Sequence, residues 1–231
     1  MNDQDNICTC QDCLRKTTVF NHLTNEELSA FNASRYQTKY KSGEIIFKQG
    51  TAITHIMSFT KGLAKVYIEG YNNRDLILKL IKSGTLIGGP GVLVDNMHHF
   101  SVSAITDSTA CFIDINEYKK ALNNNTEFAL AALKTHNTQD ILSFNKFISL
   151  TQKQMQGRIA DAILYLSEDI FGTEAFDMTI SRQDLADLTA MSKESAIRII
   201  KEFKDDKIIS LNQNNLEILN MDKLKRFSEI G

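Results

Sequence analysis

The chain has 231 residues, of which 42% are hydrophobic and 23% charged, with one proline and a formal net charge of −2 at pH 7. This length suffices for one large or two small domains, and the composition excludes a disordered or collagen-like chain. The longest apolar run covers only residues 128–133, whereas a membrane-spanning helix needs roughly 20 apolar residues. Residues 1–6 lack the pattern of a secretory signal. We therefore expect a cytoplasmic protein with no membrane partner.

The distribution of glycine predicts a change of architecture near residue 115. Eight of the 11 glycines lie between Gly43 and Gly91. Within this region, short apolar runs rich in Ile, Val, Phe and Tyr alternate with turn residues, which predicts antiparallel strands in a barrel or roll. A helix capped by Thr24, with Glu27 three residues later, precedes them. The expected strands are residues 44–47, 53–59, 63–68, 76–81, 100–105 and 110–115.

One long helix is predicted after residues 123–126, because neither glycine nor proline follows until Gly157. Within it, alternating steps of four and three residues form a coiled-coil seam. The alternative is a helix that packs on its own barrel. We interpret the seam as a dimer interface with Ile141, Phe144 and Ile148 as its apolar contacts. The full seam consists of Leu130, Lys134, Asn137, Ile141, Phe144, Ile148, Thr151 and Met155.

A helix-turn-helix is predicted near the C-terminus. Ser181 and Asp184 form a capping box that opens a short helix, which stops at residues 189–191. Ser192 caps a second helix that runs to about Lys204, and a three-residue turn between short helices is the helix-turn-helix spacing. The expected buried face of the second helix is Ala196, Ile199, Ile200 and Phe203, and a hairpin wing is expected at residues 208–211 and 216–219.

The opposite face of the second helix is the candidate DNA-reading surface. Arginine can donate two hydrogen bonds to guanine, and glutamate can accept one from cytosine. Two alternatives stay open: Glu194 and Arg198, four residues apart, form only a surface ion pair, or the helix-turn-helix never contacts DNA. No catalytic motif is found, so we do not expect an enzyme. The candidate DNA-binding residues are Ser192, Lys193, Glu194, Ile197, Arg198 and Lys201.

Several segments in order resemble the superfamily of the cyclic-AMP receptor protein and the fumarate-nitrate-reduction regulator (Crp/Fnr). They read KSGEIIFKQG at 41–50, GTLIG at 84–88, GRIADAILYL at 157–166, ISRQDLA at 180–186 and MSKESAIR at 191–198. The resemblance implies an α+β fold with an N-terminal jelly-roll sensor (a double-stranded β-helix of the cyclic-nucleotide-binding type), a long dimerisation helix and a C-terminal winged helix-turn-helix. The corresponding residues are 1–13 for a cysteine-bearing leader, 14–125 for the sensor, 126–153 for the helix and 154–231 for the DNA-binding domain.

The resemblance also implies a homodimer that binds a palindrome in double-stranded DNA and contacts RNA polymerase. Glu194 and Arg198 match the family's pair that reads a shared TGA core. Ile197 departs from the serine or glycine of the two best-known branches, and an exposed isoleucine could contact a thymine methyl group. The positions matching the family's cyclic-nucleotide contacts carry Gly89, Ser101 and Val102. Without a cation there to neutralise a phosphate, no cyclic nucleotide is expected.

The four cysteines suit one iron–sulfur cluster. Cys8, Cys10 and Cys13 form C-x-C-x2-C in the leader, Cys111 lies far along the chain, and four thiolates are the ordinary ligand set of a [4Fe-4S] cluster. In the oxygen-sensing branch that this pattern resembles most closely, three leader cysteines spaced C-x2-C-x5-C and one in the roll hold the cluster. We therefore expect sensing of oxygen or nitric oxide by such a cluster.

Other interpretations of the cysteines remain open. They could hold zinc, which has no redox chemistry, or act as a simple thiol switch, and Cys111 could be a small buried core residue. Another small effector could act instead. A haem would need an axial ligand, for which the candidates are His22, His55, His98, His99 and His136.

Overall fold

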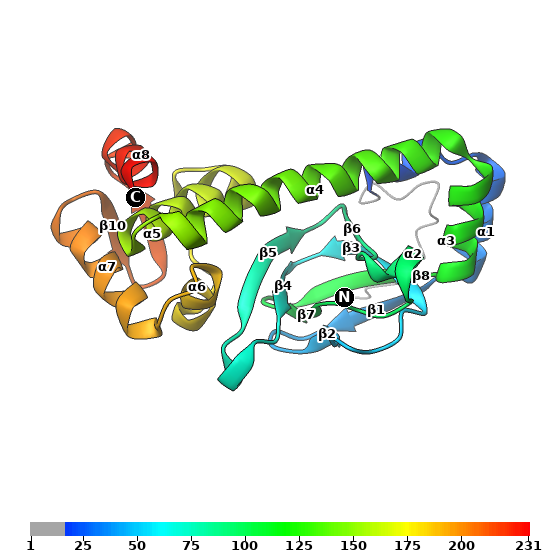
Figure 1. Cartoon of the computed structure of the whole chain (residues 1–231), viewed down its shortest axis with the longest axis horizontal. Helices are drawn as coiled ribbons and strands as arrows, with labels where there is room; N and C mark the ends of the chain where they lie inside the picture. The colour runs from blue at the N-terminus through cyan, green and yellow to red at the C-terminus, as the bar shows by residue number, and fades with distance from the viewer. Residues whose placement is uncertain (1–16) are drawn as a thin grey trace, which may run out of the picture. The chain divides into compact units, whose positions relative to one another are not determined.

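The structure, a computed structural model, describes residues 17–231 (Figure 1). The described chain forms two compact units. One comprises the chain up to Ala64 together with Ile81–Gln139, and the other comprises Lys65–Leu80 together with Asp140–Gly231. The predicted cysteine leader with Cys8, Cys10 and Cys13 lies outside the described residues.

The first unit opens with two short helices that close a phenylalanine-rich core. These are η1 (Thr18–His22) and α1 (Asn25–Ser34). The predicted cap of α1 is confirmed, because the Glu27 backbone N–H donates to Thr24 Oγ1 (3.2 Å) and the Thr24 N–H donates to Glu27 Oε2 (2.8 Å). Phe31 of α1 packs edge to face against Phe20 and Phe128, with ring centroids 5.6 and 6.1 Å away, respectively.

Eight strands form the roll. The first four-stranded sheet has the order β1-β8-β3-β6 and the second β2-β7-β4-β5. The predicted strand at 63–68 is confirmed at both ends, and the other predicted strands are present with shifted ends, whereas β1 and β6 were not predicted. The bounds are β1 Tyr36–Tyr40, β2 Ile45–Phe47, β3 His55–Lys61, β4 Leu63–Ile68, β5 Leu76–Lys82, β6 Thr85–Ile87, β7 Ser101–Ala104 and β8 Ser108–Asp114, with η2 Tyr71–Asn73 and α2 Gly91–Val94 between strands.

The predicted long helix is confirmed as α4 (Thr126–Gln152), which follows α3 (Ile115–Asn124), but it ends earlier than expected. Gln154 is extended (φ −69°, ψ 169°) and immediately precedes α5 (Met155–Tyr165), so the predicted seam residue Met155 belongs to the next helix. The Asp161 carboxylate accepts hydrogen bonds from Ser149 Oγ (2.5 Å) and Lys153 Nζ (2.8 Å). These contacts join α4 to α5 and stabilise the break, although neither glycine nor proline marks it.

The remaining chain forms a winged helix-turn-helix. Its three-stranded sheet has the order β10-β11-β9, and the predicted hairpin wing is confirmed as β10 and β11, whereas β9 and α8 were not predicted. The predicted fold class is therefore confirmed: a β-roll, a long helix and a C-terminal helix-turn-helix. The bounds are η3 Leu166–Phe171, β9 Ala175–Asp177, α6 Arg182–Leu188, α7 Lys193–Asp205, β10 Ile209–Asn212, β11 Asn215–Ile218 and α8 Met221–Ile230. None of the helices within residues 17–231 is long and apolar enough to cross a membrane.

Gly62, in the turn between β3 and β4, allows a test of the roll. Its φ is +94°, and a methyl group added there would lie 2.7 Å from the Asp107 carbonyl oxygen and also collide with Ser108. Gly43 has a similar φ of +87° but open space around it. Both substitutions to Ala incur a backbone cost of about 1–2 kcal/mol, and we expect Gly62→Ala alone to add about 1–3 kcal/mol of overpacking. Urea denaturation measures the difference, and equal destabilisation of the two variants would contradict this packing.

Candidate nucleic-acid interface

The first helix of the predicted helix-turn-helix, α6, is fixed at its start by its own side chains. The predicted capping box is confirmed: Ser181 Oγ accepts from the Asp184 backbone N–H, and Asp184 Oδ2 accepts from the Ser181 N–H, each at 3.0 Å. The chain then turns at Ala190, whose φ is +51°, and the Met191 N–H donates to the Ala186 carbonyl oxygen (3.1 Å). This turn ends α6 and starts α7 without a glycine.

The second helix, α7, has one buried and one exposed face. Ser192 caps it by accepting a hydrogen bond from the Ser195 N–H (3.2 Å). The predicted buried face is confirmed, and Phe203 packs against Phe227 of α8 with ring centroids 5.0 Å apart. Because one side is packed on the unit, the other side is presented to solvent as a rigid surface. The buried residues are Ala196, Ile199, Ile200 and Phe203.

Every residue predicted to read DNA lies on the exposed side. Ile197 is 44% exposed, so an apolar side chain is accessible among the polar residues of this face. Hydrogen bonds from its own backbone N–H and from the Ser192 side chain lower the pKa of Glu194, so its carboxylate is ionised at neutral pH. The exposed residues are Ser192, Lys193, Glu194, Ile197, Arg198 and Lys201.

The ion pair on this face is not the one weighed from the sequence. Arg198 Nη1 donates to Glu202 Oε1 at 2.6 Å, so Glu194 does not take the guanidinium. Both carboxylates lie four residues from Arg198 on the same helix, and spacing alone cannot choose between them. Glu202 is thus a residue of the site that the sequence analysis missed. Lys204 Nζ donates to the Leu211 carbonyl oxygen (3.1 Å), which connects the end of α7 to the wing.

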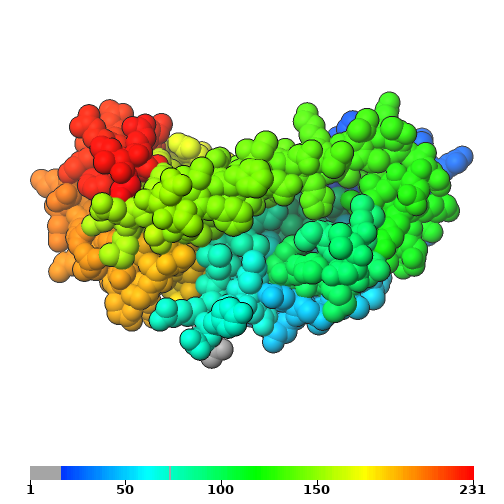
Figure 2. All heavy atoms as spheres, viewed as in Figure 1, coloured from blue at the N-terminus to red at the C-terminus, as the bar shows by residue number. Residues whose placement is uncertain are grey.

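The helix α4, green to yellow-green in Figure 2, lies at the surface in this view. Several of its large apolar side chains remain exposed. The predicted interface residues Ile141, Phe144 and Ile148 are 60%, 59% and 49% exposed. Only Phe128 and Ala132 of this helix are buried. Further exposed apolar residues of α4 are Leu130, Leu133, Leu142 and Phe147.

Cys111 is the one predicted cluster ligand within the described residues. It lies half-buried on β8, opposite Gln37 of β1 and Ser58 of β3, so it is not the fully buried core residue that was the alternative. Arg35 Nη1 donates to Cys111 Sγ at 3.7 Å, and Arg35 Nε donates to Asn32 Oδ1 at 2.9 Å. A guanidinium beside a thiol stabilises the thiolate, the form that ligates metals and reacts. The sequence analysis missed Arg35.

No group of three or more His, Cys, Asp or Glu residues within the described chain is arranged to hold a metal ion. Of the histidines considered as haem ligands, His98 is buried and stacks on Phe47 with ring centroids 3.9 Å apart. Its Nδ1 makes no hydrogen bond within the described chain, and burial lowers its pKa. The other four lie at the surface or half-buried: His22, His55, His99 and His136.

Ser101 and Gly89, two of the residues at the predicted cyclic-nucleotide positions, are closely surrounded by other groups of the roll. Ser101 is fully buried, and its hydroxyl accepts a hydrogen bond from the Gln49 backbone N–H at 2.8 Å. Gly89 has a φ of +81°, and a methyl group added there would lie 3.0 Å from the Phe100 ring. The expectation that no cyclic nucleotide binds stays a prediction.

Comparison with known families agrees with this architecture. A model of the cyclic nucleotide-binding domain matches residues 37–125, and a model of the Crp-like helix-turn-helix domain matches residues 157–227 of the same chain. The chain belongs to the Crp/Fnr family of transcription regulators. Regulators of this Crp/Fnr family bind DNA and function as dimers.

Individual relatives support the family and not one of its branches. The chain is 23% identical to the transcriptional activator protein FnrL of Cereibacter sphaeroides, over 87% of this chain and 84% of that protein. It is also 23% identical to the cAMP-activated global transcriptional regulator CRP of Escherichia coli O6:H1, over 84% of this chain and 95% of that protein. A putative Crp/Fnr regulator from Eubacterium rectale shares the fold, with a TM-score of 0.75 at 17% identity, over 92% of this chain and 98% of that one.

The pairing of Arg198 with Glu202 has a measurable consequence for DNA binding. Replacing Glu202 with Ala removes a negative charge and frees the guanidinium, so we expect DNA affinity to rise by a factor of about 2–5 at low salt, the scale of an exposed ion pair. Fluorescence anisotropy over a salt series measures the effect, which should fade as salt screens the charges. Repeating the substitution in an Arg198→Ala background is the control, and the same gain there would show that the pair itself is irrelevant.

Proposed function

We propose that this Crp/Fnr regulator is a homodimer that reads a palindromic DNA site with α7, one half-site per copy. The observation that carries the proposal is the division of α7 into a packed face and an exposed face bearing Glu194, Ile197 and Arg198. A helix packed in this way can enter the major groove without losing its shape. Arg198 would donate to a guanine, Glu194 would accept from a cytosine, and Ile197 would contact a thymine methyl group.

The charge of α7 supports a modest and salt-sensitive affinity. Residues 193–204 contain four basic and two acidic residues, in a chain with a net charge of −2. Attraction to phosphate is therefore a local property of this strip, in which Lys193 and Lys201 are exposed. Phosphate contacts set affinity and its salt dependence, whereas base contacts set specificity.

Dimerisation through α4 is the part of the proposal that makes palindromic reading possible. An exposed apolar strip around Ile141, Phe144 and Ile148 is costly in water, and a second copy of the helix would bury it in a coiled-coil seam. Two reading helices in one dimer then bind together, and each raises the effective concentration of the other at its half-site. We also propose that the DNA-bound dimer contacts RNA polymerase.

We propose further that the regulator senses oxygen or nitric oxide through a [4Fe-4S] cluster held by Cys8, Cys10, Cys13 and Cys111. Of these ligands, Cys111 lies within the described residues and suits the role, since the residue is only half-buried and Arg35 donates to its sulfur. A cationic hydrogen-bond donor favours the thiolate and offsets the negative charge of a four-thiolate site. When bound, such a cluster supplies a centre that oxygen or nitric oxide can degrade.

Base reading is tested on a duplex selected from a randomised library with the full-length protein prepared without air. We expect Arg198→Ala to weaken binding by about 1–3 kcal/mol per half-site, or roughly 5- to 150-fold, and to relax the base preference at one position of each half-site. Lys193→Ala, a phosphate contact, should weaken all duplexes alike and lower the salt dependence. An Arg198→Ala protein with an unchanged base preference would refute the assignment.

Cluster sensing is tested by iron and acid-labile sulfide analysis of protein purified without air. We expect about four of each per chain, lost in air together with DNA binding or dimer mass. Cys111→Ser should lose the iron and make DNA binding indifferent to air. Gln37→Ala, a change at the facing β1 position, should retain both the iron and the sensitivity of DNA binding to air. Zinc in place of iron would refute the cluster in favour of a zinc site. Metal-free protein with reversible thiol oxidation would refute it in favour of a thiol switch.

A further inference from the structure

Two lysines from outside the helix-turn-helix hold the two ends of α6. Lys65 of β4 contacts Asp184 in the first turn, and Lys146 of α4 contacts the carbonyl oxygen of Leu188 at the last residue. Both lysines belong to the same compact unit as α6. The two contacts therefore link α6 to two other elements of that unit, the β4–β5 ribbon and the C-terminal part of α4.

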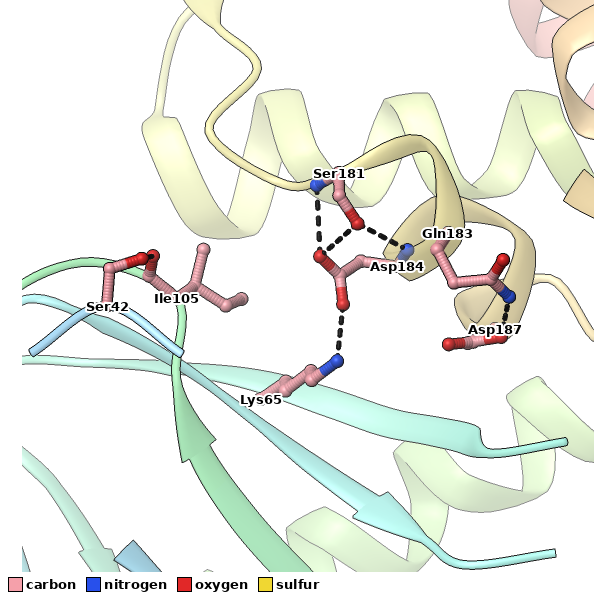
Figure 3. A network of polar contacts seen from close by, with 7 residues as sticks. All are labelled: Ser42, Lys65, Ile105, Ser181, Gln183, Asp184 and Asp187. Carbon is pink, nitrogen blue, oxygen red and sulfur yellow. Dashed lines mark hydrogen bonds and ion pairs between the residues drawn. The ribbon is translucent and has the colours of Figure 1, made fainter. Parts of the chain in front are cut away.

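The contact at the start of α6 is a largely buried ion pair (Figure 3). Lys65 Nζ lies 2.5 Å from Asp184 Oδ1, and the two side chains are only 22% and 12% exposed. Asp184 Oδ2 is already occupied by Ser181 in the capping box. One carboxylate thus joins the cap of α6 to the ribbon, so the helix cannot turn away from β4 without breaking the pair.

Burial and the neighbouring charge have opposite effects on the pKa of Asp184. Burial alone would raise the pKa of Asp184, but hydrogen bonds from Lys65 and Ser181 and the positive charge of Lys65 together hold it below its usual value. The pKa of Asp187, one turn further along the helix, is raised by its burial. Removing Lys65 would leave the Asp184 charge buried without its partner, which is far more costly than losing an exposed pair.

The contact at the end of α6 uses a carbonyl group that the helix itself leaves without a partner. Lys146 Nζ donates to the Leu188 oxygen at 3.0 Å, and a cation at this end also complements the helix dipole. Burial lowers the pKa of Lys146 to about 8, so the ammonium form prevails at neutral pH. The residue after Leu188 starts the turn to α7, so this hold lies next to the reading helix.

The ribbon that carries Lys65 is itself fixed within the unit. The Leu80 backbone N–H of β5 donates to the Tyr165 hydroxyl of α5 at 2.9 Å. β4 and β5 are neighbours in one sheet, so Lys65 reaches α6 from a strand pair that is tied to α5. The support of α6 is therefore a connected frame rather than a single side chain.

We propose that Lys65 and Lys146 are positioning residues that set the orientation of α6, and of α7 with it, so that the dimer reads two half-sites at one particular spacing. The inference rests on the proposed function of a dimeric palindrome reader. Half-sites on one face of DNA lie about one helical turn apart, so a small rotation of each reading helix shifts the spacing that fits. Lys146 is decisive here because it extends from the helix that we assign to the dimer interface.

The test compares Lys65→Met and Lys146→Met with the parent on three kinds of duplex. These are the selected palindrome, versions with its half-sites moved one base pair closer or further apart, and a duplex with a single half-site. For each variant we expect affinity for the palindrome to fall about tenfold, affinity for the single half-site to change less than about twofold, and discrimination between spacings to shrink. Lys65→Arg should restore discrimination, since it keeps the charge.

Lys223→Met is the matched control. It removes an ammonium group that lies 3.3 Å from Asp206 within the same unit but does not touch α6, so spacing discrimination should persist. If a variant lost affinity equally for the palindrome and for the single half-site, the inference would be overturned. Full discrimination between spacings in both Lys65→Met and Lys146→Met would overturn it as well. Neither result would contradict the proposed function. A parent protein that binds one half-site as tightly as the palindrome would overturn the dimeric reading function, and the inference with it. Circular dichroism confirms that the variants compared are folded.

Discussion

The carboxylate of Asp184 is shared between two tasks, and the DNA-binding unit depends on both. One oxygen closes the capping box with Ser181 and lets α6 begin where it does, while the other accepts the Lys65 ammonium. A buried ion pair is seldom the most stabilising choice for a given site, because both charges lose their water. What it provides is direction, since an ion pair in a low-dielectric environment is satisfied in few geometries, whereas apolar contacts tolerate sliding.

The reading helix shows the same division between rigidity and chemistry. Its buried side is apolar and packs against α8, so the exposed side can carry charges without contributing to folding. On that side Arg198 forms an ion pair with Glu202. In the DNA complex that we propose, the guanidinium would exchange this partner for a base, and the net gain would be the difference between the two interactions. An acidic residue next to a base-reading arginine thus moderates affinity for wrong sequences as well as for the right one.

Around Cys111 the structure adds a residue that changes its chemistry. A cysteine on a strand of a roll is by default a small packing residue, but here the Arg35 guanidinium donates a hydrogen bond to the Cys111 sulfur. This pairing is compatible with a metal ligand and with an oxidisable thiol, and the two differ in whether iron accompanies the protein. The family relationship does not choose between them, because the activator FnrL and the cAMP-activated regulator CRP are both 23% identical to this chain.

The sequence by itself determined the features that arise from neighbours in the chain. The capping boxes at Thr24 and Ser181, the apolar face of α7 and the strand at 63–68 depend on residues within one or two turns or on strict patterning, so the roll, the long helix and the helix-turn-helix could all be predicted. Short strands such as β9, with three residues, carry too little pattern to be recognised. The helix α8 was likewise missed.

Only the tertiary structure decided contacts between distant segments and choices between equal neighbours. The end of α4 at Gln152 depends on Asp161 and could not be read from glycine or proline. The choice of Glu202 over Glu194 as partner of Arg198 is one between two residues at the same helical spacing. Lys65 and Asp184 are 119 positions apart, and nothing local to either residue indicates the other. Local pattern encodes hydrogen bonding and burial within an element, whereas the pairing of charges depends on which surfaces the folded chain brings together.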